Sequence, residues 1–180
     1  MAQVSPDVRW APLEYAAGIG ASEPPILVAF DGSAAARQAV MAAARLLGPV
    51  RALVVTVWEP ALAHATIAGA PDVSMAPTAD PGAILELDSE LQRNAERVAG
   101  EGAELARAQG LDAEPLAVSD VGSVPGTILS LAAQSGAAAI VVGSRGLGGI
   151  RARMEGSTSR GVVKRAVCPV LVVHDPADRD

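Results

Sequence analysis

Glycine and hydroxyl residues gather between residues 143 and 158 in a pattern suited to binding an anion. Gly143 and Gly146 follow an apolar run at 137–142, and Gly156-Ser157-Thr158 opens a segment with helical spacing, which gives the pattern G-x2-G-x9-G-S. Glycines let a backbone turn sharply and approach a ligand closely. Hydroxyls and the free N–H groups of a helix N-terminus bind phosphate. The stretch therefore predicts a phosphate site between a strand and a helix; the alternative is a glycine-rich loop that only turns the chain.

A second candidate for chemistry is Asp31, which follows the apolar run 26–30 and precedes Gly32-Ser33. An ionised carboxylate is a strong acceptor for hydroxyl donors such as those of ribose. Ser33 is a residue type preferred at helix N-caps. Asp31 is therefore either a ligand-binding carboxylate or a structural residue of the turn and cap.

Apolar runs and helical periodicities alternate along the chain and predict the elements that would position these residues. Pro115 lies inside the third run, which suits a strand at the edge of a sheet. The alternation predicts a doubly wound α/β fold with parallel strands and right-handed crossovers. The expected strands are 26–30, 51–57, 113–118, 137–142 and 168–174, and the expected helices are 33–47, 84–109, 123–135 and 157–166.

The long helix over 84–109 carries apolar residues at helical spacing, with charged residues mostly elsewhere, so its apolar stripe is expected to face the sheet. Gly100 and Gly102 are expected to weaken or bend this helix, and Gly110 is expected to end it. The same spacing places Leu46 and Leu47 on the apolar side of the first helix and Val163 and Val167 on that of the last. The stripe of the long helix consists of Ile84, Leu87, Leu91, Ala95, Val98, Gly102 and Leu105.

Composition along the chain predicts its organisation. Residues 1–24 show no clear period, so we expect an extension that is flexible or laid over the domain. One domain is expected over 25–175, followed by a polar tail at 176–180. Inside the domain, the stretch 59–82 is rich in proline and glycine and is expected to be a long functional or mobile loop.

Charge and composition argue against several classes of protein. The net charge of −6 disfavours a nucleic-acid partner, and no apolar run approaches the roughly 18 residues of a membrane span. One cysteine, Cys168, and two isolated histidines predict no disulfide and no metal site. No signal peptide is visible, so a cytoplasmic protein is expected. Lys164 follows no Walker loop, Gly-x-Ser-x-Gly is absent and no general base can be named, so enzymatic activity is uncertain and no catalytic residue is assigned.

The pattern G-x2-G-x9-G-S resembles the nucleotide-binding signature of the ATP-binding branch of the universal stress protein family. The likeness extends to the runs 26–33, 122–128 and 168–173 and covers about residues 25–174. Ala138 stands where the family commonly has an acidic residue, and the loop 59–82 is untypical. Neither departure touches the phosphate pattern.

The resemblance implies a five-stranded parallel sheet of order 3-2-1-4-5 with helices on both faces. The first and fourth strands would then be neighbours, which places Asp31 beside Gly143 at the switch point where such sheets bind ligands. The implied cofactor is ATP, with Asp31 on the ribose, the backbone near Val57 at the adenine and the glycine loop on the phosphates; whether Mg²⁺ accompanies the phosphates is left open. The implied nucleotide-binding residues are Ala29, Asp31, Val57, Gly143, Ser144, Arg145, Gly146, Gly149, Gly156, Ser157 and Thr158.

The run 168–174 would lie at an edge of this sheet, and an apolar edge strand can pair with its own copy about a two-fold axis, so we expect a homodimer through it. The resemblance implies the same interface. The alternative is that the N-terminal extension folds over this edge. The protein would act in stress response or regulation through ligand-dependent conformation or partner binding. Three alternatives remain: a dimeric interaction protein with an empty site, a slow ATP hydrolase, and a binder of cyclic nucleotides.

Overall fold

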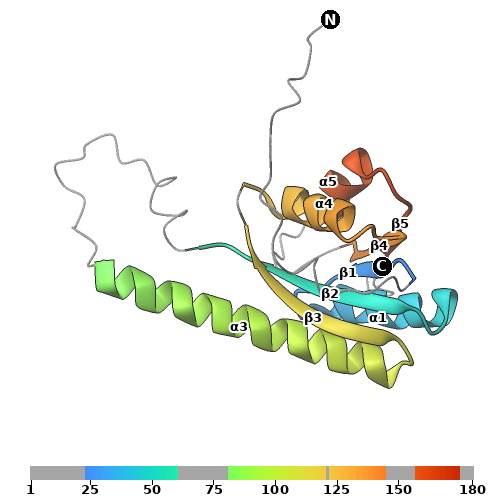
Figure 1. Ribbon diagram of the computed structural model, residues 1–180, viewed down its shortest axis with the longest axis horizontal. Helices are drawn as coiled ribbons and strands as arrows, with labels where there is room; N and C mark the ends of the chain where they lie inside the picture. The colour runs from blue at the N-terminus through green and yellow to red at the C-terminus, as the bar shows by residue number, and fades with distance from the viewer. Residues whose placement is uncertain (1–22, 61–80, 121, 145–156, 175–180) are drawn as a thin grey trace, which may run out of the picture.

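Five parallel strands form the sheet at the centre of the molecule, and helices cover both of its faces (Figure 1). The computed structural model describes residues 23–60, 81–120, 122–144 and 157–174. Nearly all of the predicted extension and of the long loop, and the whole tail at 176–180, lie outside these ranges. The elements, labelled as in Figure 1, are β1 (Ile26–Ala29), α1 (Ala34–Leu47), β2 (Arg51–Trp58), α3 (Pro81–Ala108), β3 (Asp112–Ser119), α4 (Val124–Gln134), β4 (Ala139–Gly143), α5 (Ser157–Arg165) and β5 (Val170–Val173).

The strand order is β3-β2-β1-β4-β5, which confirms the predicted doubly wound sheet. The central strand β1 pairs with β2 on one side and β4 on the other, so that Ile26 lies opposite both Ala52 and Ala139. The carboxyl ends of β1 and β4 are therefore neighbours, although more than a hundred residues separate them in sequence. In a sheet of this kind that junction is the expected ligand site.

Two apolar layers hold the helices on the sheet. One layer joins the sheet to α1 and α3, and the other joins it to α4 and α5. The first layer is built largely from alanines, among them Ala39 on α1 and Ala103 on α3, and its one aromatic ring is Phe30. Small side chains let the helix backbones lie close to the strands. This layer is therefore densely packed because helix and sheet approach closely, and not because large side chains fill the space between them.

The buried side of α3 differs from the predicted stripe. Leu87 is 47% exposed, and the first turns of the helix extend beyond the sheet (Figure 1). The fully covered residues lie in the second half and are alanines, spaced by four and three, together with Gly102. The prediction was therefore wrong for Leu87, and Ile84 and Leu91 are only partly buried, because the first turns of this 28-residue helix lie beyond the sheet. The buried alanines are Ala95, Ala99, Ala103 and Ala106.

Gly102 makes a close contact with the sheet in α3, which runs unbroken from Pro81 to Ala108. A Cβ added at Gly102 would lie 2.6 Å from Phe30 Cδ1 and 2.8 Å from Val54 Cγ1. Such distances are too short for real carbon atoms, so only glycine permits this approach of helix to sheet.

Local signals at the helix ends agree with the predictions. The Ser33 hydroxyl accepts the Ala36 N–H at 3.1 Å and caps α1. At the end of α3, Gly110 has φ +93°, and bonds from Gly110 N–H to Arg107 O and from Leu111 N–H to Ala106 O complete a Schellman motif.

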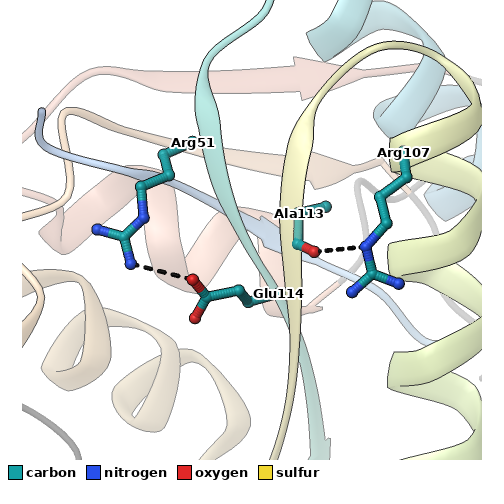
Figure 2. A network of polar contacts seen from close by, with 4 residues as sticks. All are labelled: Arg51, Arg107, Ala113 and Glu114. Atoms are coloured by element: carbon teal, nitrogen blue, oxygen red, sulfur yellow. Dashed lines mark hydrogen bonds and ion pairs between the residues drawn. The ribbon is translucent and has the colours of Figure 1, made fainter. Parts of the chain in front are cut away.

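The strand β3 lies at one edge of the sheet, where Pro115 is tolerated. Figure 2 shows how β3 is fastened: Arg51 of β2 forms an ion pair with Glu114 at 3.2 Å, and Arg107 Nε of α3 donates to the Ala113 carbonyl at 2.8 Å. These contacts tie the edge strand to its neighbouring strand and to the helix behind it.

The strand β5 forms the other edge and is shorter than the predicted 168–174. Its four residues are all partly exposed. On the preceding segment Val163 is 53% exposed and Val167 97%, so their predicted place on the apolar side of α5 is wrong. Leu46 and Leu47 at the end of α1 are exposed in the same way. Within the described ranges, no helix is both long enough and apolar enough to cross a membrane.

Candidate functional site

The turn after β1 places Asp31 at the carboxyl edge of the sheet. One oxygen of its carboxylate, Oδ1, accepts the Ser33 N–H at 3.0 Å, and Ser33 in turn caps α1. Asp31 is thus a turn residue, as one alternative held. A carboxylate has about four acceptor positions, so the turn bond and a bond to a ligand hydroxyl are compatible.

The end of β4 lies directly against the first turn of α1 at Gly143. A Cβ at this position would lie 2.8 Å from the carbonyl carbon of Ala35 and 3.0 Å from its oxygen. Gly143 therefore has a packing role that the sequence pattern did not reveal. This contact holds the carboxyl end of β4 against the helix that follows Asp31.

Ser144 is the next residue and is 2% exposed. Its N–H donates to the Val173 carbonyl at 2.8 Å, and its own carbonyl accepts the Ser159 hydroxyl at 3.4 Å. These bonds join β4, β5 and α5 at one point. The Ser144 hydroxyl itself has no hydrogen-bond partner among the described residues. A buried hydroxyl without a partner costs free energy unless a partner is supplied, so the Ser144 hydroxyl is a candidate donor to a polar ligand or to water.

The N-terminus of α5 stands at the same junction, because Ser159 in its first turn bonds to Ser144. Ser157 is exposed and Thr158 is partly exposed. Gly161 fixes the helix, since a Cβ there would lie 2.7 Å from Pro125 Cγ on α4. The first-turn N–H groups and the helix dipole favour an anion at this end.

The predicted residues fall into two groups. The structure gathers Ala29, Asp31, Val57, Gly143, Ser144, Ser157 and Thr158 at the carboxyl edge of the sheet. Arg145, Gly146, Gly149 and Gly156 lie outside the described residues.

Two polar residues at this edge were missed by the prediction. Thr56 is buried and donates its hydroxyl to the Phe30 carbonyl at 2.8 Å, and Ser159 is buried beside Ser144. Thr56 could have been noticed in the sequence as a hydroxyl residue within an apolar stretch of a predicted strand. Ser159 could have been noticed as the third hydroxyl residue of the run Ser157-Thr158-Ser159. In the described part of the chain, no three His, Cys, Asp or Glu side chains come together as metal ligands would.

The strand order and the junction of β1, β4 and α5 define a doubly wound α/β protein, a class in which ligands generally bind at the switch point of the sheet. The sequence profile of the Universal stress protein family matches residues 24–174, and the chain belongs to this family.

Individual relatives agree with this assignment. The chain is 34% identical over 91 residues to Universal stress protein YxiE of Bacillus subtilis (strain 168), an alignment that covers 51% of this chain and 60% of the relative. The solved structure of hypothetical protein MJ0577 superposes with a TM-score of 0.65 at 20% identity, covering 84% of this chain and 95% of that one, and supports the fold. A universal stress protein solved in complex with cAMP is 26% identical, with a TM-score of 0.51 and coverage of 83% and 95%.

Proposed function

We propose that this protein binds an adenine nucleotide, with ATP as the principal ligand, at the carboxyl ends of β1 and β4. The observation that carries the proposal is the buried Ser144 hydroxyl, which lacks a partner among the described residues and lies beside the N-terminus of α5. A phosphate oxygen would satisfy this hydroxyl and the first-turn N–H groups together. The glycine pattern over 143–157, which resembles a nucleotide-binding signature, is in accord with this ligand.

The roles proposed for individual residues come from the family resemblance and agree with their places at this edge. Ser144, Ser157 and Thr158 would contact the phosphates, Asp31 the ribose, and the main chain near Ala29 and Val57 the base. Phosphate contacts are also proposed, from position in the sequence alone, for Arg145, Gly146, Gly149 and Gly156. Mg²⁺ would enter with the phosphates rather than through protein ligands.

The protein would act as a binding module in stress response or regulation, in which the bound nucleotide changes the conformation offered to a partner. Turnover is expected to be slower than the ordinary enzymatic range of roughly 1–10³ s⁻¹, because no general base is assigned in the sequence. A steady-state phosphate-release assay on the purified protein checks this expectation.

A cyclic nucleotide is the second candidate ligand. The relative solved with cAMP is 26% identical over most of this chain, which favours testing cAMP beside ATP. Both ligands would present a phosphate to α5 and an adenine to β2, so the same junction would hold either.

We also propose that the protein forms a homodimer through 168–174. The strand β5 lies at an edge, its residues are all partly exposed, and none of them carries a charge. Antiparallel pairing with a second copy would satisfy the open edge.

Isothermal titration of the parent and of Ser144→Ala with ATP plus Mg²⁺, and separately with cAMP, tests nucleotide binding. We expect Ser144→Ala to bind on the order of tenfold or more weakly, because a hydrogen bond to a charged group is lost. Its stability without ligand should be unchanged or higher, because the hydroxyl that it removes has no partner among the described residues.

Ser135→Ala is the matched control. The Ser135 hydroxyl donates to the Leu131 carbonyl at 2.8 Å at the end of α4, which precedes the amino end of β4. This variant should lose a little stability and no affinity. Absence of any nucleotide binding by the parent, or equal affinity of Ser144→Ala, would contradict the proposal.

A further inference from the structure

A buried hydroxyl interrupts an apolar strand where β1 leaves the sheet. Thr56 is 7% exposed and lies on the face of β2 that packs on α1 and α3, where the neighbouring residues of that face are Ala52 and Val54. Valine would fill nearly the same volume without a polar atom. The hydroxyl is therefore meaningful only through the bond that it makes.

That bond is to the Phe30 carbonyl at 2.8 Å, one residue before Asp31. The pairing of β1 with β2 ends at Ala29 opposite Val55, and the Phe30 N–H still donates to the Val55 carbonyl at 2.8 Å. In a parallel ladder, a residue bonds through its N–H and its carbonyl to the two residues that flank its partner. The next bond of the ladder would thus run from the Val57 N–H to the Phe30 carbonyl.

The structure replaces this bond by the Thr56 hydroxyl. Among the backbone hydrogen bonds of the described residues outside regular elements, none joins Val57 to Phe30. By the alternation of a parallel ladder, the N–H and carbonyl of Val57 face the side on which β1 has departed, and the residue as a whole is partly exposed. Its N–H and carbonyl form a donor and an acceptor side by side at the carboxyl edge, which is the pattern that a nucleobase edge can satisfy.

We propose that Thr56 is a positioning residue for nucleotide binding: by engaging the Phe30 carbonyl it ends the β1–β2 ladder one bond early and leaves the Val57 main chain for the base. The inference rests on the nucleotide binding proposed above and adds the residue that prepares the base contact. Thr56 itself does not touch the ligand.

Amide hydrogen exchange in the ligand-free protein tests the first half of the proposal. The Val57 amide should exchange much faster than that of Val55, which lies within the β1–β2 ladder. ATP should then slow exchange at Val57. Equal protection of the two amides before ligand is added would overturn the proposal whether or not the protein binds nucleotide.

Variants test the second half. Thr56→Val removes the donor at nearly constant volume, and we expect about fivefold weaker ATP binding by titration calorimetry, since the Phe30 carbonyl becomes available to the Val57 N–H. Thr56→Ser keeps the donor and should bind within about twofold of the parent. A loss in Thr56→Ser as large as that in Thr56→Val would show that the methyl group, not the hydroxyl, matters, and would contradict the proposal.

Thr127→Val is the matched control, because Thr127 is also buried and donates its hydroxyl to Asp120 Oδ1 at 3.0 Å. Thr127→Val should lose about as much stability as Thr56→Val and should keep the ATP affinity of the parent. Equal weakening of ATP binding by Thr127→Val and Thr56→Val would reduce the effect to general destabilisation and overturn the proposal. A parent that binds no nucleotide would refute the proposed function and this inference with it, whereas a binding parent with unchanged Thr56→Val refutes the inference alone.

Discussion

The contact between Gly102 and Phe30 can be measured by comparing two glycines of the same helix. Gly100 and Gly102 both lie inside α3, and neither has a positive φ. A Cβ at Gly100 meets nothing within 4 Å, whereas one at Gly102 would lie 2.6 Å from Phe30 Cδ1 and 2.8 Å from Val54 Cγ1. The two substitutions to alanine therefore share the same gain in helix propensity and differ only in the clash.

The magnitudes follow from these two terms. Alanine in place of glycine inside a helix stabilises by about 0.5–1 kcal/mol, so Gly100→Ala should raise the free energy of unfolding by that amount. Overpacking a well-filled core costs about 1–3 kcal/mol, because Phe30 and Val54 are buried and cannot swing away. The difference between the two variants should therefore be about 1–3 kcal/mol in favour of Gly100→Ala.

Urea denaturation of both variants and the parent measures this difference directly. For a chain of this size it corresponds to roughly 2–4 °C in Tm per kcal/mol. The slope of unfolding free energy against urea should stay constant, since both variants keep the native fold. Equal stability of the two variants would refute the close approach of α3 to the sheet.

Two further predictions concern the site and the edge strand. Asp31→Asn keeps an acceptor for the Ser33 N–H but loses the charge, so stability should hold while ATP affinity falls on the order of tenfold, as titration calorimetry would show; a loss of stability with normal affinity would make Asp31 purely structural. Leu171→Pro removes an edge N–H and bends β5, so sedimentation at micromolar concentration should show monomer where the parent shows dimer; a monomeric parent would contradict the proposed dimer.

The sequence predicted the types of the elements well, because their signals are local. Ser33 and Gly110 mark helix ends through bonds to residues a few positions away, and the structure shows these bonds. The strand order has no such signal, since β1 pairs with a β4 that lies more than a hundred residues later. It was predicted through the family resemblance, which supplies what local patterns cannot.

The faces of the helices were harder to predict. Leu87 and Val167 were placed on apolar sides because large apolar residues usually indicate burial, yet both are exposed. The buried surface of α3 instead consists of alanines, which weigh little in any hydrophobic periodicity. Burial here is decided by which segment lies over the sheet, and that depends on the tertiary arrangement.

The candidate site was predicted only in part, because its contacts also depend on the tertiary arrangement. Asp31 and Ser144 stand out by type and position next to apolar runs, and the structure places them at neighbouring strand ends. Gly143 was expected to approach a ligand, but its visible contact is with Ala35. Thr56 was missed because a single hydroxyl in a strand becomes informative only when its acceptor, 26 residues away, is known.

The central place of β1 also has a consequence for synthesis of the chain. The strands β1, β2 and β3 are made first and can pair with one another, but the second side of β1 stays open until β4 appears. Ser119 ends β3 and Gly143 ends β4, 24 residues later, which takes about 1–5 s at a synthesis rate of about 5–20 residues per second. During this interval the N–H and C=O groups on the open side of Ile26–Ala29 are unpaired, and the strand carries apolar side chains. It is therefore an open template for strand pairing. Released truncated chains that end between Ser119 and Gly143 should therefore self-associate, and chains extended past β4 should not.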